Sequence, residues 1–216
     1  MPEKAIMGLK LAYIRKNYQK SKLSEETISG NPFELFEKWY EEAVKVLENE
    51  PNAMVLSTVS NNKPSARIVL LKELLDETFL FFTNYLSRKG KEIENNPNVA
   101  LTFFWPVSER QVRIEGVVEK IDAVSSSNYF NIRPEESRIS AIISPQSQVI
   151  SAKKILETEY ALFVSEKKPI QRPDYWGGYR CIPQTIEFWQ GGEHRLHDRI
   201  RFIKEKTTWK TERLAP

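Results

Sequence analysis

The chain has 216 residues, of which 40% are hydrophobic and 28% charged, and its formal net charge at pH 7 is +3. These values are ordinary for a globular protein with one main domain, and so small a net charge gives no support for nucleic-acid binding. The single cysteine, Cys181, cannot form an internal disulfide, and no apolar run predicts a signal peptide or a transmembrane helix. We therefore expect a cytoplasmic protein.

The N-terminal part of the chain is predicted to be mostly helical. Apolar residues at helical spacing predict a short helix over residues 6–20, and a polar connector follows over 21–31. Residues 31–51 predict a longer helix, with Asn31 as its N-cap and Pro32 at its first helical position. The apolar stripe of this helix consists of Phe33, Phe36, Trp39 and Ala43.

After residue 52, short segments rich in β-branched and aromatic residues predict strands. They span residues 53–60, 65–72, 78–84, 99–105, 110–121, 177–190, 199–205 and 209–216. Predicted helices over 87–97, 125–144 and 151–163 lie between them. Because most strands follow one another without alternating with helices, the order predicts an α+β protein with an antiparallel sheet or small barrel. The glycine patterns of the Rossmann fold and the P-loop are both absent.

The predicted helix over 87–97 carries positive charge at an unfavourable end. Ser87 is a good N-cap, but Arg88 and Lys89 follow it at the helix N-terminus, which is already partly positive. A bound anion would reverse this cost, because free N–H groups, the Ser87 hydroxyl and both cations would face it. The alternative is a pair of solvated cations on a surface helix.

Two further segments combine cations with polar groups. Arg67 and Lys72 bracket an apolar run, and strict strand alternation would place them on opposite faces. Tyr129 and Arg133 are four residues apart on one face of a predicted helix, and together with Ser137 they offer donors that suit a phosphate. The alternatives are a central strand with charged ends and a helix end with a solvated arginine.

Both histidines of the chain, His194 and His197, lie just after a Gly-Gly pair, with Arg195 between them. A zinc site is disfavoured because it needs three or four protein ligands, and the chain has one cysteine and no third histidine. A general acid or base role stays open, as does a plain polar loop after a glycine turn. The density of charged and titratable groups beside Trp189 favours a site for an anionic, aromatic small molecule.

Several segments together resemble the pyridoxine (pyridoxamine) 5′-phosphate oxidase family. They are ARIVLLK (66–72), FFTNYLSRKGKEIENNP (81–97), ERQVRIEG (109–116), WGGYR (176–180) and IEFWQGGEHRLHDR (186–199). The resemblance implies an antiparallel FMN-binding split β-barrel with surrounding helices, in a homodimer with the flavin at its interface. It also implies oxidation of pyridoxine or pyridoxamine 5′-phosphate to pyridoxal 5′-phosphate, with dioxygen as acceptor and hydrogen peroxide released.

By this resemblance, the functional residues of the family are assigned to positions of this chain. The residues expected to contact FMN are Arg67, Ile68, Val69, Leu70, Leu71, Lys72, Phe82, Thr83, Ser87, Arg88, Lys89, Gln111, Gln146, Ser147, Trp189 and Arg199. The residues expected to contact the substrate are Arg15, Lys16, Asn17, Tyr18, Lys72, Tyr129, Arg133, Ser137, Arg195, Leu196 and His197. Arg195 and His197 are expected to be catalytic, no metal is implied, and we expect His194 to be structural.

The expected organisation is an N-terminal segment, residues 1–30, that closes over the site, and a split-barrel flavin-binding domain, residues 31–216. The expected partners are phosphorylated B6 vitamers, dioxygen and a second copy of the chain, without nucleic acid or membrane. One alternative is a related split-barrel flavin reductase or a cofactor-binding protein, which would keep the FMN residues and lack the substrate residues. Another is a nucleic-acid-binding module on a small barrel, whose basic residues would form one open stripe.

Overall fold

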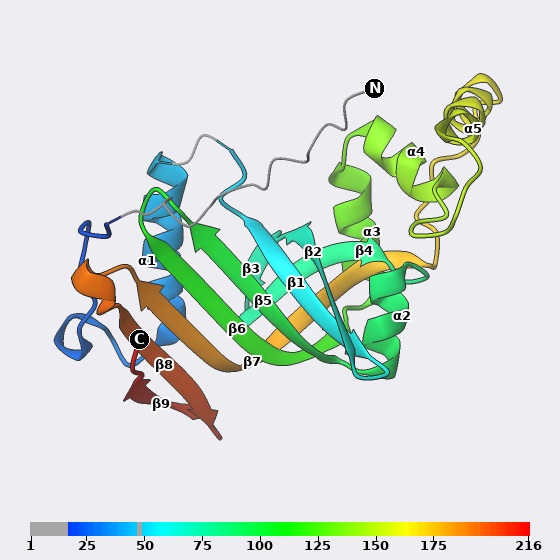
Figure 1. Ribbon diagram of the computed structural model, residues 1–216. Helices are drawn as coiled ribbons and strands as arrows, with labels where there is room; N and C mark the ends of the chain where they lie inside the picture. Colours follow the sequence, from blue (N-terminus) through cyan, green and yellow to red (C-terminus); the bar gives the residue numbers. More distant parts are fainter. Residues whose placement is uncertain (1–16, 47–48) are drawn as a thin grey trace, which may run out of the picture.

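The computed structural model describes residues 17–46 and 49–216, where nine strands form one antiparallel sheet with helices around it (Figure 1). The strands are β1 (Ala53–Ser60), β2 (Lys63–Leu70), β3 (Glu73–Leu75), β4 (Thr78–Asn84), β5 (Asn98–Trp105), β6 (Arg110–Lys120), β7 (Trp176–Gln190), β8 (Asp198–Glu205) and β9 (Thr208–Arg213). The helices are α1 (Pro32–Val46), α2 (Arg88–Asn95), α3 (Ala123–Ile132), α4 (Glu135–Ile143) and α5 (Lys153–Ser165), with 3₁₀ turns at Glu25–Thr27 and Glu193–Arg195. The α+β prediction is confirmed.

The sheet is organised around β7, its longest strand. The strand order is β2-β1-β5-β6-β7-β4-β3, and β8 also pairs with β7 and carries β9 at its outer edge. Along one edge, β7 pairs with β4 over residues 176–181 and with β8 over residues 185–190. Along its other edge it pairs with β6 over both halves. The two halves of β7 therefore belong to two different groups of strands.

A β-bulge lies close to the point where β7 changes partner. The register between β6 and β7 shifts at Glu115 and Gly116, and Gln184 has no counterpart on β6. A Cβ at position 116 would lie 2.2 Å from the carbonyl oxygen of Ile182, so only glycine allows this close approach of the two backbones. The extra residue bends and twists the strand, which lets its two halves serve different parts of the molecule.

The main core lies between α1 and the inner face of the sheet (Figure 1). The ring of Phe36 is 5.0 Å from that of Phe79, and the ring of Trp39 is 5.2 Å from that of Phe188. All four residues of the predicted apolar stripe are buried. The side chain of Asn31 accepts a hydrogen bond from the backbone of the first turn at 2.9 Å, which confirms the predicted N-cap.

Helices α2 to α5 gather at the other end of the molecule, near β4 and the start of β7 (Figure 1). The predicted helix over 125–144 is divided here into α3 and α4. Arg133 ends α3 in an extended conformation (φ −72°, ψ 151°), because a residue before proline is disfavoured from the helical region. The prediction that Tyr129 and Arg133 share a helix face is therefore wrong.

The other differences from the predicted elements are small. Residues 17–20 are not helical, so the predicted helix over 6–20 is wrong for that part, and residues 6–16 lie outside the described residues. The three-residue strand β3 was not predicted, and β2 ends at Leu70, so Lys72 lies beyond the strand. None of the helices in residues 17–46 and 49–216 has the length and apolarity to cross a membrane.

Candidate active site

A basic cluster, consisting of Arg67, Arg88, Lys89 and the carboxylate of Glu92, lies between β2 and α2. Arg67 reaches back across the sheet, where its Nη1 donates to the carbonyl oxygen of Leu56 at 3.2 Å and to Oγ1 of Thr58 at 2.6 Å. Its Nη2 donates to the hydroxyl of Ser65 and, at 2.9 Å, to Oε2 of Glu92. The terminal nitrogens of Arg67 are thus held by the chain itself.

Glu92 is the anion at the centre of this cluster, and it is buried. It accepts hydrogen bonds from the hydroxyls of Thr58 at 2.6 Å and Ser65 at 2.8 Å. It also accepts one from Nε of Arg88 at 2.8 Å. Burial alone would raise the pKa of Glu92, but these bonds and the one from Arg67 together lower it to about 2. Glu92 is therefore ionised throughout the physiological range.

The N-terminus of α2 is capped as predicted, since the backbone N–H of Gly90 donates to Oγ of Ser87 at 3.3 Å. Arg88, however, does not depend on a ligand for its counter-charge, because it pairs with Glu92 one turn later. Lys89 donates from Nζ to Oγ1 of Thr83 at 3.2 Å. Burial, and then the charge of Arg67, lower the pKa of Lys89, so an anion beside it would stabilise its charged form.

A hollow of about 310 Å³ opens beside this cluster. Its lining includes Arg88, Glu92, Gln146 and Ser147. Oε1 of Gln146 accepts from Nζ of Lys89 at 3.2 Å, which connects the hollow to Lys89. Ser147 has a φ of 73°, a left-handed conformation that is uncommon for a residue with a side chain and that often marks functional loops.

An aromatic cluster lies where β4 and the start of β7 meet α3. It consists of Phe82, Tyr129, Trp176 and the guanidinium of Arg133. The rings of Phe82 and Tyr129 stack with centroids 3.9 Å apart, and Phe82 is 5.6 Å from Trp176. The guanidinium of Arg133 lies 4.7 Å from the ring centroid of Trp176. These contacts fix Arg133 beside the end of the sheet.

Arg133 has a donor that the described residues leave unused. Its Nη1 is buried and has no hydrogen-bond partner there, and burial lowers the pKa of its guanidinium. Arg133 and Ser137 together line a hollow of about 380 Å³. A buried, unpaired donor is costly, so this hollow has the chemistry of an anion site.

Lys72 lines a different hollow from Arg133 and Ser137. With Phe82 and Tyr129 it lines a separate hollow of about 560 Å³. The structure therefore brings Tyr129 together with Lys72 and Phe82, but it does not place Lys72 in the hollow of Arg133 and Ser137.

A histidine cluster lies at the other end of β7. It consists of Tyr18, Trp189, His197 and Arg195. The ring of His197 is 4.8 Å from that of Trp189, and the ring of Tyr18 is 5.6 Å from both. A Cβ at Gly191 would lie 2.7 Å from Cγ of Tyr18, so the glycine lets residue 18 approach the strand end. Asn17, Tyr18 and Arg195 line a hollow of about 220 Å³.

The imidazole of His197 is held in one orientation. Its Nδ1 accepts a hydrogen bond from the backbone N–H of Gly192 at 3.1 Å, so the neutral ring carries its proton on Nε2. Burial, and then the charge of Arg195, lower the pKa of His197. His194 (φ 53°) and Arg195 (φ 67°) are both left-handed, which marks this turn as strained.

The strand register places three of the predicted FMN residues in one row beside this cluster. Gln111 on β6 is opposite Trp189 on β7, which is opposite Arg199 on β8, so the three side chains share one face of the sheet. Arg199 donates from Nε to Oε1 of Glu187 at 2.9 Å, and this bond raises the pKa of Arg199.

The three clusters do not form one site within a single chain. Trp176 and Trp189 are at opposite ends of β7, thirteen residues apart, or about 43 Å of extended strand. The basic and aromatic clusters lie at the Trp176 end, since Thr83 and Phe82 on β4 pair with residues 177 and 178. The histidine cluster lies at the Trp189 end, and Figure 1 shows the turn at Glu193–Arg195 far from α2 and α3.

The remaining predicted residues have mixed environments. The side chains of Val69 and Leu71 are buried in the core, whereas Ile68 and Leu196 are exposed. In the segment 67–72, Val69 and Leu71 therefore have only their backbone to offer a ligand. Arg15 and Lys16 lie outside the described residues.

The sequence interpretation missed two residues that organise these clusters, Glu92 and Trp176. Glu92 had a signal, because a carboxylate four residues after Arg88 is suited to an intrahelical ion pair. Its bond to Arg67 had none, since it depends on how α2 lies on the sheet. Trp176 begins the quoted WGGYR segment, but no spacing rule connects it to Arg133.

Comparison with known proteins identifies the relatives of this chain. The sequence model of the family described as pyridoxamine 5′-phosphate oxidase matches residues 40–163. The model described as the pyridoxine 5′-phosphate oxidase C-terminal dimerisation region matches residues 176–216. The pyridoxine/pyridoxamine 5′-phosphate oxidase of Haemophilus influenzae is 54% identical over 211 residues, covering 96% of this chain and 100% of the relative. That of Leptospira biflexa is 53% identical, covering 95% of this chain and 99% of the relative.

Solved structures have the same fold. The crystal structure of PhzG from Burkholderia lata, in complex with tetrahydrophenazine-1-carboxylic acid, superposes with a TM-score of 0.83 at 25% identity, over 88% of this chain and 95% of that chain. An FMN-binding protein related to pyridoxamine 5′-phosphate oxidase, from Nostoc punctiforme, superposes with a TM-score of 0.72 at 16% identity, over 88% of this chain and all of that chain. The predicted split-barrel architecture is confirmed.

Proposed function

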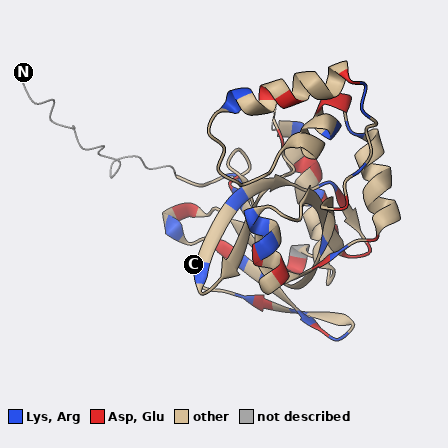
Figure 2. Cartoon of the chain, turned by 90° about the vertical axis from the view of Figure 1, so that its right-hand side faces the viewer, with Lys and Arg blue, Asp and Glu red and all other residues tan. Residues whose placement is uncertain are grey.

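Because the chain belongs to the pyridoxine/pyridoxamine 5′-phosphate oxidase family, we propose that it is an FMN-dependent oxidase that forms pyridoxal 5′-phosphate. Its substrates are pyridoxine 5′-phosphate or pyridoxamine 5′-phosphate, and dioxygen is the electron acceptor. The near-complete match to oxidases at 54% identity favours this activity over a flavin reductase or a non-catalytic protein. In the cartoon of Figure 2, the positions of Lys and Arg are interspersed with those of Asp and Glu along the chain, which does not favour a nucleic-acid module.

The chemistry of the described residues fits a flavin mononucleotide. Lys89, partly buried near the charge of Arg67, gains a counter-charge from a phosphate, and Arg88 lines the adjacent hollow. The amide of Gln146 and the hydroxyl of Ser147 complete this end. The row of Gln111, Trp189 and Arg199 supplies an aromatic face and polar groups for a planar heterocycle.

The substrate phosphate is assigned to Arg133 and Ser137. The observation that carries the proposal is the buried Nη1 of Arg133, which lacks a partner among the described residues and opens onto a hollow with Ser137. A phosphate oxygen at this point would satisfy the donor and stabilise the charge that burial disfavours. Tyr129 and Lys72 are assigned to the same ligand from the neighbouring hollow.

The separation of the clusters supports a site shared between two subunits. The match to the dimerisation region covers β7, β8, β9 and the turn between β7 and β8, which together hold Trp189, Arg195 and His197 of the histidine cluster. In a homodimer, the basic and aromatic clusters of one subunit would meet Gln111, Trp189, Arg199, Arg195 and His197 of the other. This arrangement brings to the flavin and the substrate all the groups that one chain holds about 43 Å apart along its strand.

The chain's own residues bind and align the reactants. A bound FMN would supply the redox chemistry, as acceptor of a hydride from C4′ and carrier of its two electrons to dioxygen. The hydroxyl or amine on C4′ would give up the proton that completes hydrogen peroxide, and the imine formed from the amine would release ammonia on hydrolysis. His197, with Nδ1 fixed by Gly192, offers its Nε2–H to the substrate, and Arg195 presents a planar cation next to it. Their work is to hold C4′ in the reacting geometry and to balance charge.

The N-terminal residues take part in this proposal as a cover. Tyr18 packs against Trp189 and His197, and the backbone N–H groups of Gln19 and Lys20 donate to Oε2 of Glu109 at 2.9 and 3.2 Å. Residues 17–20 are thus attached at the strand ends that carry the histidine cluster. A cytoplasmic location is part of the proposal, and the single, buried Cys181 is compatible with a reducing compartment.

The test is to purify the protein, release its flavin and assay it with pyridoxine 5′-phosphate. We expect a yellow protein that releases FMN rather than FAD, and one hydrogen peroxide formed for each pyridoxal 5′-phosphate. Release of FAD, absence of flavin after reconstitution, or flavin reduction without pyridoxal 5′-phosphate would contradict the proposal.

A further inference from the structure

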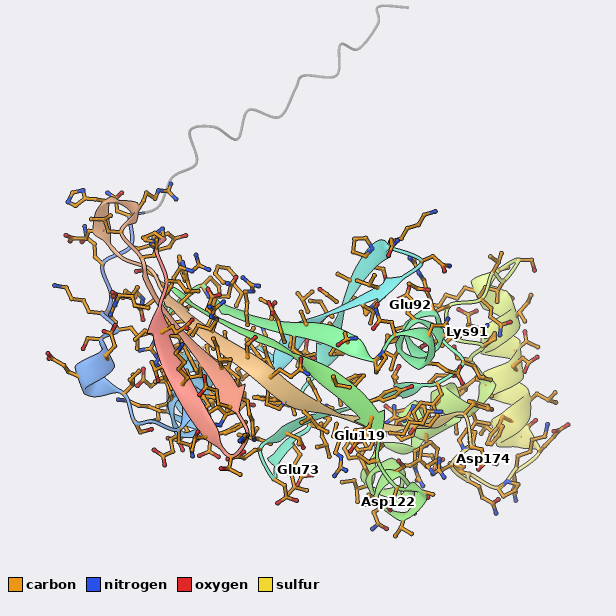
Figure 3. All side chains as sticks on the ribbon, turned by 90° about the horizontal axis from the view of Figure 1, so that it is seen from below. Glu73, Lys91, Glu92, Glu119, Asp122 and Asp174 are labelled. Atoms are coloured by element: carbon orange, nitrogen blue, oxygen red, sulfur yellow. The ribbon has the colours of Figure 1, made fainter. Side chains whose placement is uncertain are left out.

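Glu92 is a buried carboxylate among cations that the proposed function assigns to FMN. It lies on the side of α2 that faces β1 and β2 (Figure 3), where the hydroxyls of Thr58 and Ser65 donate to it. Only 7% of Glu92 is exposed. A carboxylate near a phosphate site is unfavourable unless it has another task, because like charges repel.

The hydrogen bonds of Glu92 divide the two arginines into different roles. Arg67 uses both terminal nitrogens on groups of its own chain, including Oε2 of Glu92. Arg88 is bound to Oε1 of Glu92 through Nε alone, and its side chain is 66% exposed. Within residues 17–46 and 49–216, Arg88 makes no other hydrogen bond, so both of its terminal nitrogens are left for a ligand.

We propose that Glu92 is a positioning residue for the phosphate of FMN, which it serves by holding Arg88 through Nε. This inference rests on the proposed function. The bond fixes the plane of the guanidinium at the rim of the hollow lined by Gln146 and Ser147, and it directs the free fork toward the anion. A long side chain that is ordered before binding loses less entropy when the ligand arrives.

The charge of the cluster is consistent with this role. Arg67, Arg88 and Lys89 carry three positive charges, and Glu92 carries one negative charge, which leaves +2. A phosphate monoester carries about −1.5 to −2 at pH 7. Glu92 thus offsets Arg67, whose terminal nitrogens are bonded to groups of the chain itself, while Arg88 and Lys89 match the incoming dianion.

The experiment compares binding of FMN and of riboflavin, which lacks the phosphate, to the apoprotein by quenching of flavin fluorescence. For Glu92→Ala we expect FMN to bind about 3- to 10-fold more weakly, the usual effect of leaving one long side chain unordered. Riboflavin should bind as it does to the unaltered protein. Glu92→Gln, whose amide oxygen still accepts from Nε of Arg88, should weaken FMN binding less than Glu92→Ala does. Glu94→Ala is the matched control, because it removes an exposed carboxylate of the same helix that does not line the hollow.

Each outcome decides between positioning and the alternatives. Equal weakening of FMN and riboflavin in Glu92→Ala would make Glu92 a structural residue only and overturn the inference. If FMN binding is weakened equally in Glu92→Gln and Glu92→Ala, the effect of Glu92 on binding comes from its charge, which also overturns the inference. Should the Ala variant not fold, Glu92→Asp keeps the charge and shortens the reach, and it should lose FMN affinity selectively. If the unaltered protein binds FMN no better than riboflavin, the proposed phosphate site itself is wrong.

Discussion

The backbone N–H of Gly192 donates a hydrogen bond to Nδ1 of His197 across 3.1 Å. Since Nδ1 is occupied as an acceptor, the neutral imidazole has its proton on Nε2, at the side of the ring away from the glycine turn. Burial lowers the pKa of His197, and the positive charge of Arg195, which lies between Gly192 and His197 in the sequence, lowers it further. The turn therefore presents one neutral donor and one permanent cation side by side.

This arrangement predicts how activity depends on pH. Protonation of His197 puts a hydrogen on Nδ1 and breaks its bond to Gly192, so kcat/KM should fall as the pH falls through the lowered pKa. That pKa lies below the ordinary 6.5 because burial, and then Arg195, disfavour the charged ring. Steady-state rates from pH 5 to 8 should show this acidic limb in the unaltered enzyme and not in His197→Asn. A limb that persists in the variant would assign it to another group.

The same shift has a consequence for stability. The unfolded chain binds a proton at His197 at a higher pH than the folded chain does, so the free energy of unfolding should rise with pH between the folded pKa and 6.5. Urea titrations at several pH values, with and without His197→Asn, measure the difference. The contribution should be complete above pH 6.5 and lost as the pH falls through the folded value.

The shape of Arg195 should matter as well as its charge. Arg195→Lys keeps the charge but loses the planar fork, so we expect normal FMN occupancy and kcat/KM lower by about 10- to 1000-fold, or about 1.4–4 kcal/mol. His194→Asn is the matched control in the same turn, and it should change kcat/KM much less. Flavin content is measured on the same samples. If Arg195→Lys loses flavin and recovers full turnover when FMN is added back, Arg195 binds the cofactor and not the substrate.

A site shared between subunits predicts complementation. Arg133→Ala and Arg195→Ala should each be nearly inactive as homodimers. Refolding an equal mixture produces heterodimers in which one of the two sites takes both intact arginines, so about a quarter of normal activity should return. Mixing without refolding is the control. Activity that stays at the level of the separate variants would place Arg133 and Arg195 in the same chain's site.

Gly191 is predicted to set the approach of Tyr18. Gly191→Ala would place a Cβ 2.7 Å from Cγ of Tyr18, an overlap that forces residue 18 away from Trp189 and His197. We expect a loss of about 1–3 kcal/mol in the free energy of unfolding, together with a raised KM for the phosphorylated substrate. Thermal denaturation and steady-state kinetics measure the two effects. An unchanged KM would remove residue 18 from the substrate site.

The local features of the fold could be predicted because they depend on neighbours in sequence. The N-cap at Asn31, the stripe of α1 and the β1 segment were all correct to the residue. Pro134 indicates the break between α3 and α4, but residues 125–144 were predicted as one helix in spite of it. Strand β3 is only three residues long, too short for a periodic pattern.

The site was less predictable, because it depends on how distant segments meet. The cations of α2 were correctly singled out as a cluster, but their partner was expected to be an external anion, and Glu92 turned out to be paired with Arg88 already. Register across the sheet, which aligns Gln111, Trp189 and Arg199, cannot be read from one strand. The separation of the clusters along β7 is likewise a property of topology.

The length of β7 carries a consequence for how this chain can vary. If each copy of the strand contributes its Trp176 end to one reaction centre and its Trp189 end to the other, one uninterrupted segment spans both centres of the dimer. A deletion of one residue between these tryptophans would rotate every following side chain to the opposite face of the sheet. Substitutions along the middle of the strand leave this spacing intact, whereas insertions and deletions alter both centres at once. Descendants of this gene should therefore keep the number of residues between Trp176 and Trp189 constant, while replacements accumulate at its exposed positions, Arg180, Ile182 and Gln184.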